Sequence, residues 1–247
     1  MNVVDADGHV LEPADTWLKY LDPQYRDRAI RIARDEHGYE VLLIDGQPLK
    51  TLRGQLGALG GIDMDAAKLL TRGQISYEEG SPPGAYDPAA RLRVMDAEGI
   101  DAVLLYPTIG ICWEGHVTDG ALATAYTRAY NRWLAEFCRA DPTRLYPVAH
   151  ISLLDPEGAV EETIRARRDG CVGIYLSPDL AARGATSTTR SSRGSGRPRR
   201  TSRCQSASTS SCATGSGSAS GSGAIPPTAS SASSSSPSTS WPPSRRC

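Results

Sequence analysis

The amino-acid composition changes abruptly near residue 184, and this change limits how much of the 247-residue chain can fold. All 28 Asp and Glu residues lie at or before Asp179, whereas the 63 residues from Ala185 onward contain 22 Ser and no Leu, Val, Phe, Tyr or Met. A segment of this composition cannot bury enough apolar surface to offset the chain entropy that folding removes. We therefore expect residues 1–183 to form a folded domain and residues 184–247 to be a disordered Ser/Arg/Gly-rich tail.

The genetic code offers a specific explanation for this tail. Ser, Thr, Arg, Gly, Ala and Pro make up nearly all of it, and a TCN serine codon read from its third base becomes NTC, which encodes Phe, Leu, Ile or Val. One allowed translation of residues 185–214 in that frame ends in PVGFHVVVRD, with a His at the codon now read as Thr209. We interpret the tail as the product of a frameshift in a GC-rich gene, and a genuine flexible linker is the alternative.

Apolar runs alternate with helical patterns along the folded part. Four apolar runs are predicted strands, at residues 2–6, 101–106, 145–151 and 171–176. Three amphipathic stretches are predicted helices, at residues 88–99, at residues 120–139 and from Asp155 onward. Such alternation is typical of parallel βαβ units. The sequence therefore predicts an α/β fold, the first four βα units of a TIM-like (β/α)8 barrel that needs eight strands to close.

An insertion separates the first and second predicted strands. Residues 29–34 and 39–44 are short runs joined through His37-Gly38 and followed by a turn at Asp45-Gly46, which predicts an inserted β-hairpin. Residues 54–84 are rich in Gly and lack long apolar runs, so we expect an irregular excursion over the barrel mouth.

Charge and hydropathy argue against several classes of protein. Residues 1–183 contain 19 basic and 28 acidic residues without a basic stripe, so a nucleic-acid partner is not expected. No apolar run reaches the roughly 18 residues that a membrane helix needs, and the N-terminus lacks the features of a secretory signal. We expect a cytoplasmic protein that acts on a small molecule and keeps its thiols reduced.

The segment that opens the chain holds the sharpest chemical motif. Asp7 and His9 lie two residues apart at the C-terminal end of the first predicted strand, where alternate side chains point to the same side. Barrel enzymes carry their chemistry at that end of the strands, and a carboxylate with an imidazole suits a divalent zinc or manganese ion. The alternative is a surface turn, or an Asp that caps a helix.

Four longer strings resemble, in order, four blocks of the amidohydrolase-related family, in the branch that includes aminocarboxymuconate-semialdehyde decarboxylase. The strings are VDADGHVLEP, YDPAARLRVMDAEGIDAVLLYP, ADPTRLYPVAHISLLDPEGAVEE and GCVGIYLSP. Together they cover essentially residues 1–183. They are specific as a set and less so singly.

The resemblance implies one divalent metal, held by the first-strand motif, a His of the fifth strand and an Asp of the eighth. Asp7 and His9 occupy the first-strand positions, although many relatives have His or Glu where this chain has Asp7. The resemblance also implies a hydrolase, or a non-oxidative decarboxylase of a small aromatic or unsaturated carboxylic acid, which in its intact form is a homo-oligomer. The alternative for the chain as written is a truncated barrel fragment without catalytic activity.

Four further side chains are candidates for supporting roles, whereas no catalytic acid or base is assigned. Glu12 is either an outer-shell group of the metal or a tie for the loop before Pro13. Tyr106 and Trp113 follow the second strand of the barrel and are candidates for a substrate pocket. His150 is a third pocket candidate, with a satisfied core histidine as the alternative.

Overall fold

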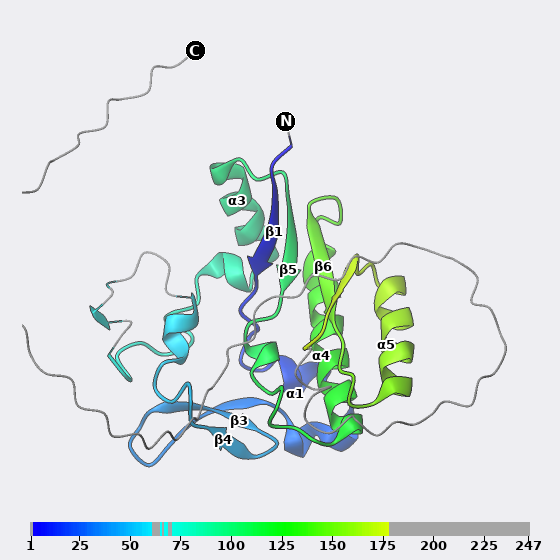
Figure 1. The fold of residues 1–247 in the computed structure, drawn as a ribbon. Coiled ribbons are helices and arrows are strands. Elements are labelled where there is room, and N and C mark those ends of the chain that lie inside the picture. The colour runs from blue at the N-terminus through cyan, green and yellow to red at the C-terminus, as the bar shows by residue number, and fades with distance from the viewer. Residues whose placement is uncertain (1, 61–64, 66, 69–70, 178–247) are drawn as a thin grey trace, which may run out of the picture. The chain divides into compact units, whose positions relative to one another are not determined.

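The computed structural model describes residues 2–60, 65, 67–68 and 71–177, which all belong to one compact unit, Met1–Ser211. The predicted division at residue 184 and the predicted disorder of the tail lie outside the described residues. Four parallel strands form the main sheet in the order β1-β5-β6-β7 (Figure 1). Their bounds are β1 Val4–His9, β5 Ala102–Tyr106, β6 Leu145–His150 and β7 Gly173–Tyr175. The predicted parallel α/β architecture is confirmed, and the first strand extends three residues further than expected.

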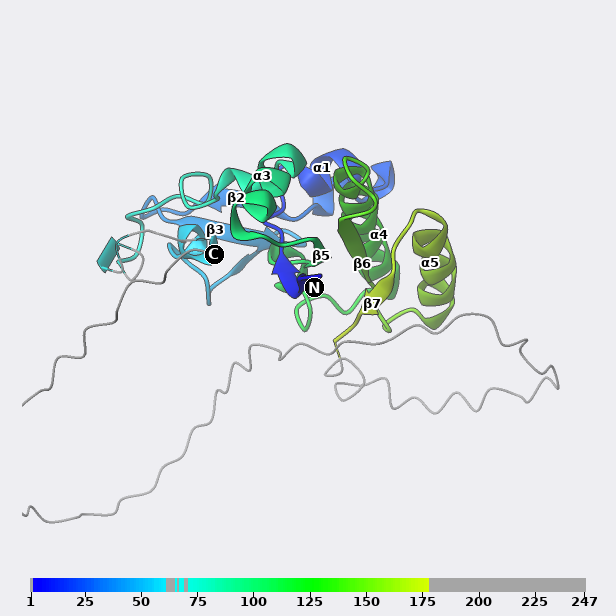
Figure 2. The same ribbon diagram turned by 90° about the horizontal axis from the view of Figure 1, so that it is seen from above.

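Three helices connect consecutive strands of this sheet, as the alternating pattern predicts. They are α3 Pro88–Glu98, α4 Gly120–Cys138 and α5 Pro156–Arg168. Each begins after an Asp whose side chain accepts backbone N–H groups of the first turn, at Asp87, Asp119 and Asp155. Figure 2 shows these helices along one side of the strands. This is the arrangement of the outer layer of a barrel.

One core cluster lies between the sheet and α4, which is the most apolar of the three helices, and a larger one joins the first half of α4 to α1 and to residues 29–49. Leu105 and Val103 of the central strand β5 are buried against Leu134 and Phe137 of α4. Four-residue spacing along α4 brings its apolar side chains onto one stripe, and burial of that stripe drives the docking of helix on sheet.

The inserted element is a second, antiparallel sheet of three strands: β2 Arg31–Arg34, β3 Glu40–Ile44 and β4 Gln47–Leu49. The predicted hairpin corresponds to β2 and β3. The strand β4 is an addition, because Asp45 and Gly46 both have positive φ, 50° and 74°, and such a two-residue turn reverses the chain into a further strand.

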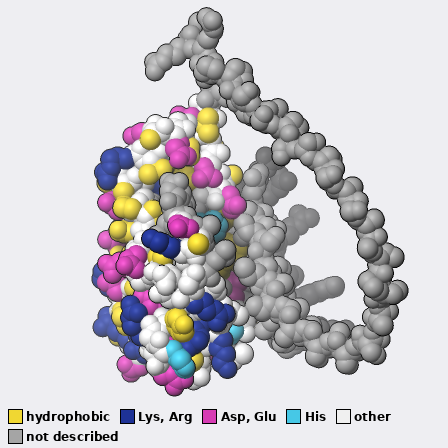
Figure 3. Space-filling model, turned by 90° about the vertical axis from the view of Figure 1, so that its left-hand side faces the viewer, with side chains coloured by type: hydrophobic (Ala, Val, Ile, Leu, Met, Phe, Trp, Pro, Cys, Tyr) yellow, Lys and Arg dark blue, Asp and Glu magenta, His cyan; other side chains and the backbone are white. Residues whose placement is uncertain are grey.

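Short helices complete the connection from β1 to α3: α1 Thr16–Tyr20, η1 Pro23–Arg28, η2 Leu56–Gly60 and η3 Pro83–Ala85. The expected irregular excursion at residues 54–84 is described only in part, and its described residues include η2 and the start of η3. Arg28 at the end of η1 bonds both Asp45 and Asp119, which joins the inserted sheet to the start of α4. The guanidinium holds the pKa of both carboxyls below their usual range. On the face in Figure 3, side chains of both charges are interspersed.

The sheet is open at both edges among the described residues, because β1 and β7 each pair on one side only. Apolar side chains are exposed near both edges. Val3 and Val4 are 49% and 52% exposed beside β1, and Val160, Ile164 and Val172 are 60%, 50% and 42% exposed around α5 and β7. The described part therefore forms about half of a (β/α)8 barrel. It contains no helix that is long and apolar enough to span a bilayer.

Leu134 tests the importance of the contact between α4 and the sheet. Because Leu134 is fully buried, Leu134→Ala should lower the free energy of unfolding by about 2–5 kcal/mol. Leu18 on α1 is 41% exposed, so Leu18→Ala, the same change in another helix, should cost less than about 1 kcal/mol. Urea denaturation followed by circular dichroism measures both, and equal losses would contradict this account of the core.

Candidate functional site

The last residues of the four parallel strands lie along one edge of the sheet. These residues are His9 of β1, Tyr106 of β5, His150 of β6 and Tyr175 of β7. His9 is the register partner of Tyr106, and His150 is the register partner of Tyr175. Three of the predicted site residues are thus at the carboxyl edge, where barrels carry their chemistry. Tyr175 was not predicted.

Asp7 and His9 reach the same side of β1, as their spacing predicts. The Nε2 atom of His9 lies 3.8 Å from Oδ1 of Asp7, and the two side chains are 43% and 70% exposed. The register of β1 against β5 shifts between Asp5 and Gly8, so the strand is irregular just where these side chains emerge. The backbone N–H of Asp7 donates to Asp5 within this irregular stretch.

Two contacts at Nδ1 orient the ring of His9. This atom lies 2.9 Å from the carbonyl oxygen of Pro107, directly after β5, and 3.3 Å from the hydroxyl oxygen of Thr108. A carbonyl only accepts, so Nδ1 carries the hydrogen and donates it, and the lone pair of the neutral ring is on Nε2, the atom that faces Asp7. Metal-binding histidines commonly have this arrangement, in which one ring nitrogen donates to a carbonyl and the other binds the ion.

The backbone around His9 is held from the opposite direction by Arg91 of α3. Its guanidinium donates to the carbonyl oxygens of His9 and Gly84. Burial lowers the pKa of Arg91. Arg91 therefore directly supports the backbone of the first-strand motif.

Glu12 is fully buried and lies under the turn that follows β5. Its carboxylate accepts the backbone N–H groups of Thr108, Ile109 and Gly110 at 3.1, 2.9 and 3.0 Å, which begin the short helix η4, Ile109–Ile111. Burial raises the pKa of Glu12, and the hydrogen bonds oppose this shift. Glu12 thus ties the segment after β1 to the segment after β5, and its role toward a metal stays a prediction.

His150 lies in a separate, fully buried cluster. Its Nε2 atom is 2.5 Å from Oε1 of Glu114, and its ring is 5.3 Å from Trp113 and 5.1 Å from Tyr175. Its Nδ1 atom has no hydrogen-bond partner in the described part of the chain, and the same is true of the Tyr130 hydroxyl, whose ring is 6.2 Å away. One ring nitrogen of His150 thus has a hydrogen-bond partner and the other has none among the described residues. This state is intermediate between a pocket residue and a fully hydrogen-bonded core histidine.

The three predicted pocket residues divide between two places. The ring of Tyr106 lies 6.1 Å from that of His9, and burial raises the pKa of Tyr106, which keeps its phenol protonated. Trp113 lies beside His150 instead. Tyr175 links the two places, because it packs in one cluster with Tyr106 and also contacts His150.

Sequence reasoning missed Glu114, the acidic partner of His150. The two residues are separated by 36 positions, so no periodic pattern pairs them. The sequence signal that could have identified Glu114 is its position directly after the pocket candidate Trp113. A carboxylate beside a buried aromatic residue needs a hydrogen-bond partner.

Asp7 and His9 would supply two ligands, which is fewer than the three protein ligands that a catalytic metal usually has. Within residues 2–60, 65, 67–68 and 71–177, no group of three or more His, Cys, Asp or Glu side chains is arranged to hold a metal ion. The donor set therefore fits a divalent ion as one part of a larger site.

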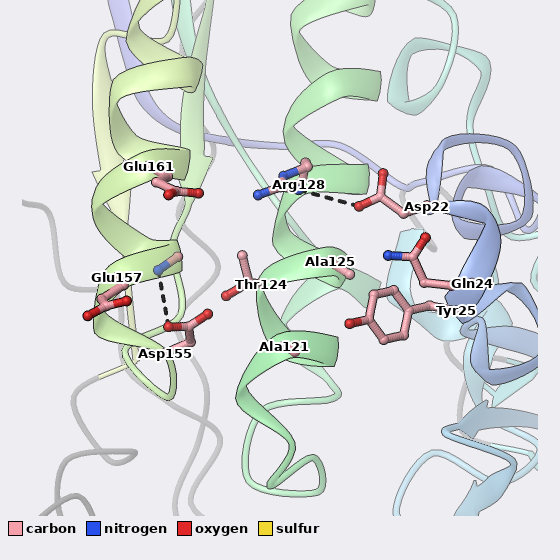
Figure 4. Close-up of a pocket in the computed structure, with 11 residues that line it drawn as sticks. Asp22, Gln24, Tyr25, Ala121, Thr124, Ala125, Arg128, Asp155, Glu157 and Glu161 are labelled. Atoms are coloured by element: carbon pink, nitrogen blue, oxygen red, sulfur yellow. Dashed lines mark hydrogen bonds and ion pairs between the residues drawn. The ribbon is translucent and has the colours of Figure 1, made fainter.

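A hollow of about 280 Å³ lies between η1, α4 and α5 (Figure 4). Its charged lining is Asp22, Arg128, Asp155, Glu157 and Glu161. Three of these groups already have partners within it, because Arg128 bonds Asp22 and the side chain of Asp155 caps α5. No strand residue and no predicted site residue lines this hollow, so we assign the candidate site to the carboxyl edge of the sheet.

The Glu114–His150 contact makes a prediction about stability. Removing the charge with Glu114→Gln should lower the free energy of unfolding by about 1–3 kcal/mol, because a buried imidazole loses its charged partner. Glu157→Gln on the exposed surface of α5 is the matched control and should have no measurable effect. A double-mutant cycle with His150→Gln that gave no coupling energy would contradict the contact.

Comparisons with known proteins identify the family of the chain. The family model described as amidohydrolase matches residues 4–189, whereas no curated protein matches the chain. An amidohydrolase from Mycobacterium avium subsp. paratuberculosis is similar in structure, with 25% identity, a TM-score of 0.56, and coverage of 71% of this chain and 49% of that one.

Two decarboxylases are more distant matches. The 2,6-dihydroxybenzoate decarboxylase from Rhizobium has 21% identity and a TM-score of 0.36. The match covers 72% of this chain and 39% of the decarboxylase. A dihydroxybenzoic acid decarboxylase from Polaromonas, with bound manganese and 2-nitroresorcinol, has 18% identity, a TM-score of 0.35 and the same coverage. The chain thus spans half or less of the length of these structures. Because the family model matches most of the chain, the protein belongs to the amidohydrolase family.

Proposed function

We propose that this chain carries the first half of the active site of a metal-dependent hydrolase or non-oxidative decarboxylase. The observation that carries the proposal is the pair formed by Asp7 and His9, with Nε2 of His9 turned toward Asp7 by the bond from Nδ1 to Pro107. Membership of the amidohydrolase family supports it. The same two residues have the donor types that zinc and manganese accept.

Each residue near the pair has a distinct part in this proposal. Asp7 and His9 hold the ion, which when bound either activates a water molecule or neutralises a substrate carboxylate. The bond to Pro107 orients the imidazole, and Arg91 holds the backbone of His9. Tyr106 supplies a protonated phenol and an aromatic surface beside His9.

The proposed substrate is a small carboxylic acid with an aromatic or unsaturated group. The aromatic rings of Tyr106, Trp113 and Tyr175 around the carboxyl edge support this class, because such side chains commonly line pockets for planar apolar groups. Hydrolysis and decarboxylation both remain within the proposal, since the residues that would distinguish them are expected on later strands.

We further propose that the chain as written is a catalytically inactive fragment whose tail is translated out of frame. The open edges at β1 and β7 and the exposed Val160 and Ile164 support this, because a closed barrel would cover them. The composition of the tail supports it as well, since the Ser codons would encode apolar residues in the next frame.

Metal analysis tests the site itself. The protein with its reading frame restored after residue 184 should bind about one divalent ion per chain, and His9→Ala should remove most of it. His37 lies on the exposed hairpin turn, so His37→Ala is the matched control and should leave the metal content unchanged. Equal metal in the wild type and in His9→Ala would refute the assignment.

Comparison of the two reading frames tests the fragment. The 247-residue chain should show negligible metal-dependent turnover, because a catalytic ion needs about three protein ligands and an enclosed site. The frame-restored protein, assayed with a panel of aromatic carboxylic acids and amide or ester substrates, should be active. Turnover by the 247-residue chain with a bound metal would overturn the proposal for the tail and for the architecture.

A further inference from the structure

We propose that Glu12 is a positioning residue that sets the tautomer of His9 through a single peptide plane. The peptide unit between Pro107 and Thr108 has its carbonyl oxygen 2.9 Å from Nδ1 of His9 and its N–H 3.1 Å from Oε1 of Glu12. The C=O and N–H of one trans peptide are coplanar and point in opposite directions. Fixing the N–H therefore fixes the carbonyl that selects the hydrogen on His9.

The Glu12 carboxylate holds this plane firmly because it binds two further peptides of the same turn. Ile109 and Gly110 donate to its two oxygens at 2.9 and 3.0 Å. The side chain of Glu12 is fully buried, and no Lys or Arg forms an ion pair with it in the part of the chain that the structure describes. Its charge is thus stabilised by backbone N–H groups, three of them in the turn, so carboxylate and turn orient each other.

The close packing around this carboxylate also favours one orientation. A Cβ added to Gly110 would lie 2.8 Å from Oε1 of Glu12 and 3.0 Å from Cβ of Pro107. Glycine at this position lets the turn approach the carboxylate. The hydroxyl of Tyr77 donates to the backbone carbonyl of Glu12 at 2.8 Å. This bond holds the backbone from which the Glu12 carboxylate extends.

The consequence for His9 is specific. With its Nδ1–H bonded to Pro107, the neutral imidazole presents the Nε2 lone pair toward Asp7. If the peptide plane turned, the Nδ1–H tautomer would lose its acceptor and Nε2 would gain a hydrogen. The inference rests on the proposed function for one point, the role of His9 as a metal ligand. The tautomer of the ring can be measured without a metal.

Nitrogen NMR of the full 247-residue chain labelled with ¹⁵N-histidine tests the proposal. The chain has four His, and His9→Gln assigns the signal of interest. In the neutral ring of wild-type His9, the hydrogen should be on Nδ1. Glu12→Gln, which removes the charge and replaces an acceptor with a donor, should produce a mixture of tautomers at His9. An Nε2–H form of His9 in the wild type would overturn the proposal without any variant.

The matched control is Glu162→Gln, because Glu162 is a similarly buried carboxylate that bonds Arg128, Arg165 and Asn131 of the helical layer. Both variants should lower the melting temperature, whereas only Glu12→Gln should change the tautomer of His9. If Glu12→Gln fails to fold, Gly110→Ala perturbs the same carboxylate from the turn and should shift the tautomer in the same direction. If the tautomer of His9 is unchanged in every folded variant, the proposal is wrong and Glu12 only connects two loops.

Titration of the frame-restored protein with Mn²⁺, followed by paramagnetic broadening of the His9 ring signals, separates this inference from the proposed function. Glu12→Gln should raise the Mn²⁺ concentration needed for half-broadening by roughly 10–100-fold, and Glu162→Gln should leave it unchanged. Absence of broadening in the wild type, together with a tautomer that responds to Glu12→Gln, would count against the metal site and support the inference. If the Mn²⁺ concentration for half-broadening is the same in Glu12→Gln and in the wild type, the metal site is supported and the inference is overturned.

Discussion

The buried carboxylate of Glu12 is the constraint on which the carboxyl edge of this sheet depends. It accepts three consecutive N–H groups of the turn after β5, and so closes that turn over the segment after β1. A buried charge is costly unless it is hydrogen-bonded, so the turn and the carboxylate stabilise each other. The position of Pro107, and through it the orientation of His9, follows from this contact.

The same connection carries a second carboxylate, 9% exposed, which bonds the neighbouring strand. Glu114 bonds His150 at the end of β6, beside Trp113. The β5–α4 connection is therefore fixed at its start to the segment after β1 and near its end to β6. Loops held in this way carry functional side chains on a rigid frame, as is usual for the strand ends of barrels.

The sheet itself explains why these contacts make only part of a site. Each described strand contributes one residue at the edge, and two edges stay unpaired. A barrel joins ligands from strands on opposite sides of its axis, whereas the four described strands bring together neighbours such as His9 and Tyr106. Exposed apolar side chains at β1 and α5 mark where the described architecture is incomplete.

The sequence by itself determined the local elements and the first-strand pair, because each has a short-range physical signal. Asp before each helix, alternation of apolar runs with helical periodicity, and the two-residue spacing of Asp7 and His9 are all readable along the chain. Only the tertiary structure decided which nitrogen of His9 is free, because Pro107 lies 98 residues away and carries no pattern that points to it. The burial of Glu12 and its three N–H partners were decided in the same way, since hydrogen bonds between distant segments depend on how the strands are placed side by side.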